Sequence, residues 1–198
     1  VRFSTPGMLI NVLGQNILIL YFGVIGDAVE LAQLVVIMRV IFLPLSLLSL
    51  PLSHLISAEV MNYVANGKAI FGFLCRVIAV LLTLSLLYVF ALLMIDVHWL
   101  RIIGIEAEFW NSYLPILIIL VLFRMTISPV SNVLNVLKKE KLLFKLQLIN
   151  VLIIGALFLV GPQDVIDGLW IYSVGSVLFQ ASIFIFILRS SHVFDQFS

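Results

Sequence analysis

The sequence predicts an all-α integral membrane protein, and three observations carry that prediction. Of its 198 residues, 63% are hydrophobic and only 11% are charged, whereas a soluble domain is roughly half apolar and about a quarter charged. The apolar residues gather in stretches of about 20, the length that crosses a bilayer as a helix. The basic residues collect in alternate connections, as they do in multi-pass proteins. The chain therefore has too little polar surface to cover a water-soluble globule.

Six stretches are long and apolar enough to be membrane spans, and none shows the strict alternation of a barrel strand. The predicted spans lie near 7–25, 29–50, 71–95, 111–137, 142–161 and 166–189. The segment near 52–69 is amphipathic and too polar to span, so we expect an interfacial helix there. The chain begins with Val1 and shows no signal-peptide pattern. We therefore expect it to be a piece of a longer protein.

Charge divides the predicted connections into two groups. One side of the predicted membrane carries eight basic residues with its adjoining helix ends: Arg2, Lys68, Arg76, Lys138, Lys139, Lys141, Lys145 and Arg189. The opposite connections carry only Arg101 among basic residues, and seven acidic ones: Asp27, Glu30, Asp96, Glu106, Glu108, Asp164 and Asp167. The positive-inside rule then predicts that the basic side, with both chain ends, faces the cytoplasm.

Two of the eleven basic residues, Arg39 and Arg124, fall deep in predicted spans. A charged side chain at a helix centre costs about 2.5–3.5 kcal/mol on insertion scales, so it is kept where it meets a partner or a water-filled cavity. All ten acidic residues lie in connections or at helix ends, so this chain has no deep carboxylate to pair with them. At about 100° per residue, Ser128 and Asn135 lie within about 40° of Arg124. The fourth span therefore carries a narrow polar stripe.

Three other spans carry thin polar strips of the same kind. They comprise Ser46, Ser49 and Ser53 near Arg39, then Ser4, Asn11 and Gln15 in the first span, and Ser173, Ser176 and Gln180 in the last. Facing one another, these strips would line a hydrated cavity in which the arginines, Asn135, Gln15, Asn11 and Ser128 bind substrate. The alternative is that serine, asparagine and glutamine only tie neighbouring helices together. A carboxylate from another part of the chain would likewise make the arginines structural.

Motifs of enzymes and of metal sites are absent from the sequence. There is no H-E-x-x-H, no Walker A loop and no G-x-S-x-G, and the three histidines are scattered. The single cysteine, Cys75, permits no internal disulfide. We therefore expect no catalytic residue, no cofactor, no metal and no nucleic-acid partner.

Two phrases carry a resemblance to a transporter family. The first is "PGMLINVLGQNILILYFGVIGDAVELAQLVVIMRVIFLPLSLL", and the second is "SPVSNVLNVLKKEK", which follows a long outer connection. Together with the six-helix pattern, they resemble the C-terminal half of the Wzx-type O-antigen and capsule flippases. These belong to the MATE-like multidrug/oligosaccharidyl-lipid/polysaccharide exporter superfamily.

The resemblance implies one six-helix bundle of a twelve-helix, two-bundle transporter whose N-terminal bundle is missing here. It also implies a function, the translocation of undecaprenyl-diphosphate-linked oligosaccharide across the bacterial cytoplasmic membrane by alternating access. The implied partners are this lipid-linked substrate, membrane lipid, the missing N-terminal half and other polysaccharide assembly proteins. A diphosphate is anionic, and arginine binds phosphate in a bidentate manner, so Arg39 and Arg124 would suit such a cargo.

Three alternatives stay open on the sequence. A lipid II flippase of the same superfamily would also use a cationic cavity, whereas a multidrug exporter takes cationic cargo and fits two arginines poorly. A membrane-embedded glycan ligase or polymerase would place catalytic residues in the outer connection near 96–110, which offers His98, Arg101, Glu106 and Glu108. A non-catalytic scaffold subunit would not need Arg124.

Overall fold

The computed structural model describes residues 4–25, 28–159, 161 and 164–197, and 90% of these residues are helical. No strand occurs within these ranges. The helices are α1 (Ser4–Ile25), α2 (Ala28–Ala65), α3 (Phe71–Leu93), α4 (Val97–Ile102), α5 (Ala107–Ser131), α6 (Val133–Val136), α7 (Glu140–Leu159) and α8 (Val165–Phe197). The predicted all-α class is confirmed.

Five helical segments of the described chain are long and apolar enough to cross a membrane. They are Ala28–Ala65, Phe71–Leu93, Ala107–Val136, Glu140–Leu159 and Val165–Ser191. The protein is therefore a multi-pass membrane protein. The first predicted span, 7–25, coincides with α1 but is not among these five. The count of six spans, like the twelve-helix arrangement, stays a prediction.

Helix α2 differs from the expected span followed by a separate interfacial helix. It continues without a break for 38 residues, past Pro44 and Pro51, so residues 52–65 extend the helix and 66–70 form the connection to α3. At 1.5 Å per residue it is about 57 Å long, well beyond a hydrocarbon core of about 30 Å. Its C-terminal part must therefore project out of the hydrocarbon, which explains why the sequence there is amphipathic.

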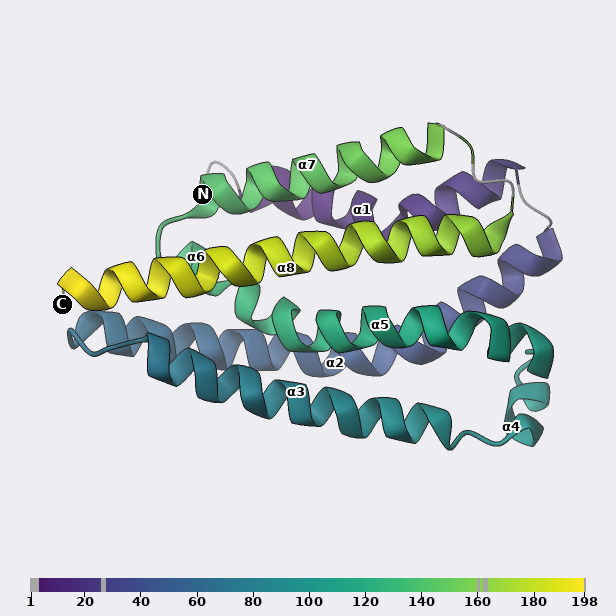
Figure 1. Ribbon diagram of the computed structural model, residues 1–198, viewed down its shortest axis with the longest axis horizontal. Coiled ribbons are helices and arrows are strands. Elements are labelled where there is room, and N and C mark those ends of the chain that lie inside the picture. The colour runs from purple at the N-terminus through teal and green to yellow at the C-terminus, as the bar shows by residue number, and fades with distance from the viewer. Residues whose placement is uncertain (1–3, 26–27, 160, 162–163, 198) are drawn as a thin grey trace.

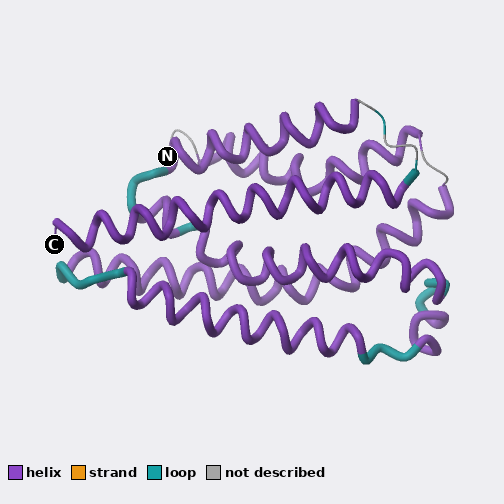
Figure 2. Tube along the Cα trace, viewed as in Figure 1, coloured by secondary structure: helices purple, strands orange, loops and turns teal. Residues whose placement is uncertain are grey.

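The connections gather at two ends of the helical bundle (Figures 1 and 2). We call one the basic end, because it carries the connection after α2, the connection before α7, the beginning of α1 and the C-terminal part of α8. Its basic residues are Lys68, Arg76, Lys138, Lys139, Lys141, Lys145 and Arg189. The other, the acidic end, carries α4 and the connection between α7 and α8, with Asp96, Glu106 and Asp164. The fold thus separates the two groups of charge as the sequence predicts.

Helix α5 is the central helix of the bundle. In the apolar stretch of the Ala107–Val136 segment, 56% of the residues are buried, compared with 17–28% in the other four segments. It packs against α2, α3 and α8, while α7 packs against α1 and α8. Apolar side chains such as Leu117 and Val121 are fully buried at its centre. Because α5 is covered on several sides, a polar group on it can reach neighbouring helices rather than lipid.

Two glycines of α8 allow its neighbours to approach closely. A Cβ at Gly175 would lie 2.8 Å from Cγ1 of Ile154 on α7, and one at Gly168 would overlap the ring of Phe22 on α1. Small residues at helix contacts are the usual means of close packing in membranes, where the hydrophobic effect does not drive association. These two positions therefore fix how α8 lies against α1 and α7.

We predict that Gly175→Leu destabilises the bundle by about 1–3 kcal/mol, the usual cost of overpacking. The added side chain has no space beside Ile154. Thermal unfolding of the purified chain in detergent would measure the loss. The matched control is Gly72→Leu, because a Cβ at Gly72 of α3 meets nothing within 4 Å. Equal melting temperatures for the two variants would contradict close packing at Gly175.

Candidate functional site

Arg124 of α5 is half-buried and reaches across to α2. Its guanidinium carbon, Cζ, lies 4.9 Å from the ring centroid of Phe42. No carboxylate of the described residues pairs with it. A cation–π contact contributes about 0.5–2 kcal/mol, which is less than the roughly 2.5–3.5 kcal/mol that a central arginine costs. Phe42 positions the guanidinium but does not offset its desolvation, so Arg124 still needs polar surroundings.

Arg39 lies on the same helix as Phe42, three residues toward the acidic end, and it is exposed. Residues three apart are neighbours on a helix surface. Phe42 therefore has Arg124 stacked over its ring and Arg39 one turn away along α2. Arg124 thus reaches from α5 to α2, and Arg39 is exposed beside the same phenylalanine on α2. We call these three residues, Arg39, Phe42 and Arg124, the arginine seam.

Toward the basic end, the same two helices are joined by a polar chain. The side-chain amide of Asn132, between α5 and α6, donates to Oγ of buried Ser53 at 2.6 Å. Asn135 of α6 donates to Oδ1 of Asn132 at 3.3 Å, and its own side chain is exposed. Ser53 of the predicted second strip is thus linked to Asn135 of the fourth-span stripe through Asn132, which lies outside that stripe. Asn135 lies at the open end of that contact.

Most serines of these strips use their hydroxyl protons within their own helix. Ser46 donates to the carbonyl of Leu43 at 2.8 Å, and Ser131 donates to the carbonyl of Ser128 at 2.7 Å. Ser128 is itself half-buried and Ser46 is exposed. A serine that donates to a carbonyl three or four residues earlier in its own helix needs no partner on another helix. These hydroxyls can still accept hydrogen bonds from water or a ligand, but they do not tie α2 to α5.

The other two predicted strips are placed only in part. The side chains of Asn11 and Gln15 in α1 lie outside the described residues. On α8, Ser173 is 1% exposed and its hydroxyl has no hydrogen-bond partner, and Oε1 of Gln180 is also buried without one. Buried polar atoms normally have partners. The fold thus leaves these two α8 oxygens without a partner among the described residues.

Several polar contacts were not anticipated from the sequence. Ser85 of α3 lies 3.4 Å from Thr126 of α5, oxygen to oxygen, and the hydroxyl of Tyr88 donates to the carbonyl of Ile41 at 2.9 Å. Ile41 lies just before Pro44, whose missing N–H and kink weaken the helical bonds around it. Tyr88 thus joins α3 to α2 within one turn of Pro44. The available signal for the Tyr88 contact in the sequence was Pro44 in one span and an isolated tyrosine, Tyr88, in the next.

Two hollows of the surface lie away from the arginine seam. One of about 630 Å³ lies over the connection before α7, and one of about 290 Å³ lies between α1 and α7 beside Tyr21 and Phe158. Neither is lined by Arg39 or Arg124. The arginine seam is therefore partly open at the side of this bundle, where Arg39 is exposed. The expected cavity would need a second wall.

Comparison of the chain with protein-family models, with curated proteins and with solved structures finds no match.

We predict that a double-mutant cycle of Ser53→Ala and Asn132→Ala gives a coupling of about 0.6–1.7 kcal/mol, the range for interhelical hydrogen bonds in membranes. The coupling would be measured from unfolding in mixed detergent. Ser46→Ala combined with Asn132→Ala is the control and should be additive, because the Ser46 hydroxyl bonds to its own helix. Additivity of the first pair would show that the 2.6 Å contact does not join the helices.

Proposed function

We propose that this chain forms one bundle of a carrier that moves undecaprenyl-diphosphate-linked oligosaccharide between membrane leaflets by alternating access. The single observation that carries the proposal is Arg124, a half-buried cation of the central helix that faces an aromatic ring and no described carboxylate. Its uncompensated charge calls for an anionic or strongly polar partner. A lipid-linked diphosphate is such a partner, and it moves within the bilayer itself.

The arrangement around Arg124 suits the two parts of such a cargo. Arg39 and Arg124 supply planar donors that match phosphate oxygens. Ser128 is half-buried and Asn135 is exposed toward the basic end, where they would hydrogen-bond sugar hydroxyls or water. The sequence places Gln15 and Asn11 in the same role from α1. The charged group of the cargo would thus bind near the middle of α5, and its sugars would bind nearer the basic end.

The open side of the arginine seam supports a two-bundle carrier. A second six-helix bundle, on the part of the chain that precedes this one, would close the seam into a cavity. Rocking of two bundles about a central site is a common route to alternating access. The proposed orientation puts the basic end, with both chain ends, on the cytoplasmic side, because lysine and arginine are in excess there. The proposed location is the bacterial cytoplasmic membrane.

Two alternatives differ in how the structure supports them. A lipid II flippase would use the same arginine seam, since its cargo also carries a diphosphate on a lipid. A membrane-embedded ligase or polymerase draws less support, because the candidates in the connection near 96–110 do not converge. Asp96 caps α4 by accepting from the backbone N–H of His98 at 2.9 Å, and His98, Arg101, Glu106 and Glu108 are all exposed.

We predict that Arg124→Ala reduces export of surface polysaccharide about tenfold to a hundredfold, since hydrogen bonds to charged groups contribute about 1.5–3 kcal/mol. The complete gene would be expressed in a host that lacks its own flippase, and surface glycan would be measured at equal membrane levels of protein. Arg124→Lys should retain intermediate export, because lysine keeps the charge but loses bidentate geometry.

The matched control is Arg76→Ala. Arg76 is exposed near the basic end, and its Nε donates to the carbonyl of Gly72 in its own helix at 3.3 Å. Its replacement should leave export unchanged. Normal export by Arg124→Ala would show that the polar stripe serves only to pack the helices together. Failure of the unaltered gene to restore any glycan would contradict the proposed cargo.

A further inference from the structure

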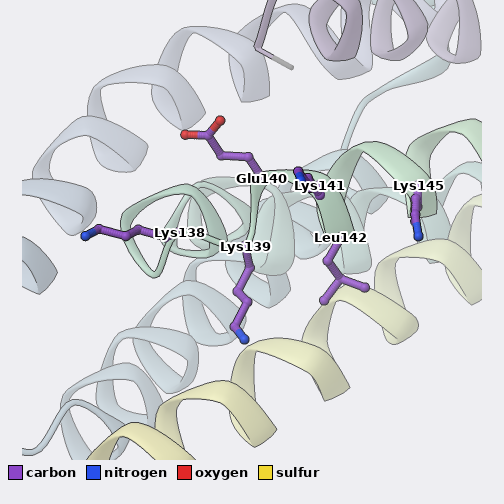
Figure 3. A pocket seen from close by; sticks show the side chains of 6 residues that line it. All are labelled: Lys138, Lys139, Glu140, Lys141, Leu142 and Lys145. Carbon is purple, nitrogen blue, oxygen red and sulfur yellow. The ribbon is translucent and has the colours of Figure 1, made fainter. Parts of the chain in front are cut away.

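The connection between α6 and α7 surrounds a hollow with lysines. The hollow has a volume of about 630 Å³ and is lined by Lys138, Lys139, Glu140, Lys141, Leu142 and Lys145. Figure 3 shows these side chains around the first turns of α7. Four lysines against one glutamate leave a local excess of positive charge. The hollow therefore has a charge complementary to a phosphate group.

The backbone of this connection is an ordered helix ending. Lys138 has a φ of 57°, the left-handed conformation that favours glycine. The N–H of Lys138 bonds to the carbonyl of Asn135 at 3.0 Å, and that of Lys139 bonds to the carbonyl of Leu134 at 2.7 Å, the pair of bonds of a Schellman ending. A lysine thus occupies a position whose backbone conformation glycine would adopt with less strain. The N-terminus of α7 follows at once and adds a positive potential.

Helix α7 continues the hollow as a strip suited to an amphiphile. Lys141 and Lys145 are one turn apart on an exposed face, and Leu148 and Leu152, exposed by 37% and 61%, follow on that face. The helix has 20 residues, or about 30 Å, which matches the hydrocarbon thickness. Its first turn therefore lies at the level of the lipid headgroups, and the lysine stems can extend to that level.

We propose that this loop and the face of α7 below it bind one anionic phospholipid. Lys141 and Lys145 hold the phosphate, Lys138 and Lys139 add to the positive potential around it, and an acyl chain lies along Leu148 and Leu152. Inorganic phosphate could use the lysines but would gain nothing from the leucines, so the amphiphilic strip favours a lipid. The inference does not rest on the proposed transport function. It requires only that α7 cross the membrane.

The test is native mass spectrometry of the purified chain in detergent with equal amounts of phosphatidylglycerol and phosphatidylcholine. Detergent micelles have no sides, so a change of membrane orientation in a variant cannot affect the result. We expect the unaltered chain to retain phosphatidylglycerol preferentially. Lys141→Gln with Lys145→Gln should lower that preference by about fivefold for each lysine removed. Replacing both by arginine should preserve it.

The matched control is Lys68→Gln with Arg76→Gln, which removes two exposed charges from the same end of the bundle but not from the hollow. It should leave the preference unchanged. An equal loss in this control would overturn a defined site in favour of diffuse surface charge. Displacement of the lipid by inorganic phosphate would overturn the lipid as occupant. Equal retention of the two lipids by the unaltered chain, with or without high salt, would overturn the proposal altogether.

Discussion

A guanidinium in the middle of a membrane helix cannot face hydrocarbon without a large cost, and the arrangement around α5 follows from that constraint. Arg124 needs polar surroundings that one cation–π contact with Phe42 cannot supply. Central placement of α5 keeps lipid away from its polar stripe, because α2, α3 and α8 cover it. The side that stays open, next to exposed Arg39, is the side from which water or an anion can reach the seam.

Polar contacts then fix the helices that surround α5. Asn132 bonds to Ser53 of α2, and Thr126 lies beside Ser85 of α3. Helix α8 also packs against α5, and its Gly168 and Gly175 let it lie close to α1 and α7. A rigid group of α2, α3 and α5 would thus carry the arginine seam. Such rigidity would let the bundle move as a body against another bundle while the site keeps its geometry.

Much of the fold could be predicted because apolar runs and charged connections are properties of single segments. The spans near 71–95 and 142–161 correspond to α3 and α7 within a few residues. The continuity of α2 could not be predicted, since residues 52–65 are too polar to read as part of a span and predict a separate interfacial helix. Asn132 was missed because it lies about 80° from Arg124 on an ideal helix, outside the stripe that the sequence defined.

The sequence could predict which charged residues belong to the candidate site. It could not predict which side chains they contact. Arg39 and Arg124 are conspicuous because charge is rare in spans. That Arg124 would lie over the ring of Phe42 depends on how α2 packs on α5, which periodicity does not specify. The sequence of one bundle could not predict the shape of the cavity that the four strips suggest. In our proposal, the other wall of that cavity belongs to the second bundle.

The central claim is that the arginine seam faces water rather than lipid, and cysteine accessibility tests it most directly. Ser46 and Leu48 are both exposed, at nearly the same depth of α2, but only Ser46 shares a face with Arg39. Each would be changed to cysteine in the complete protein with exposed Cys75 replaced by serine. Our account predicts that a membrane-impermeant maleimide, present on both sides, labels Ser46→Cys and leaves Leu48→Cys unlabelled. Equal protection of both positions from the reagent would show that the seam faces lipid and would contradict the account.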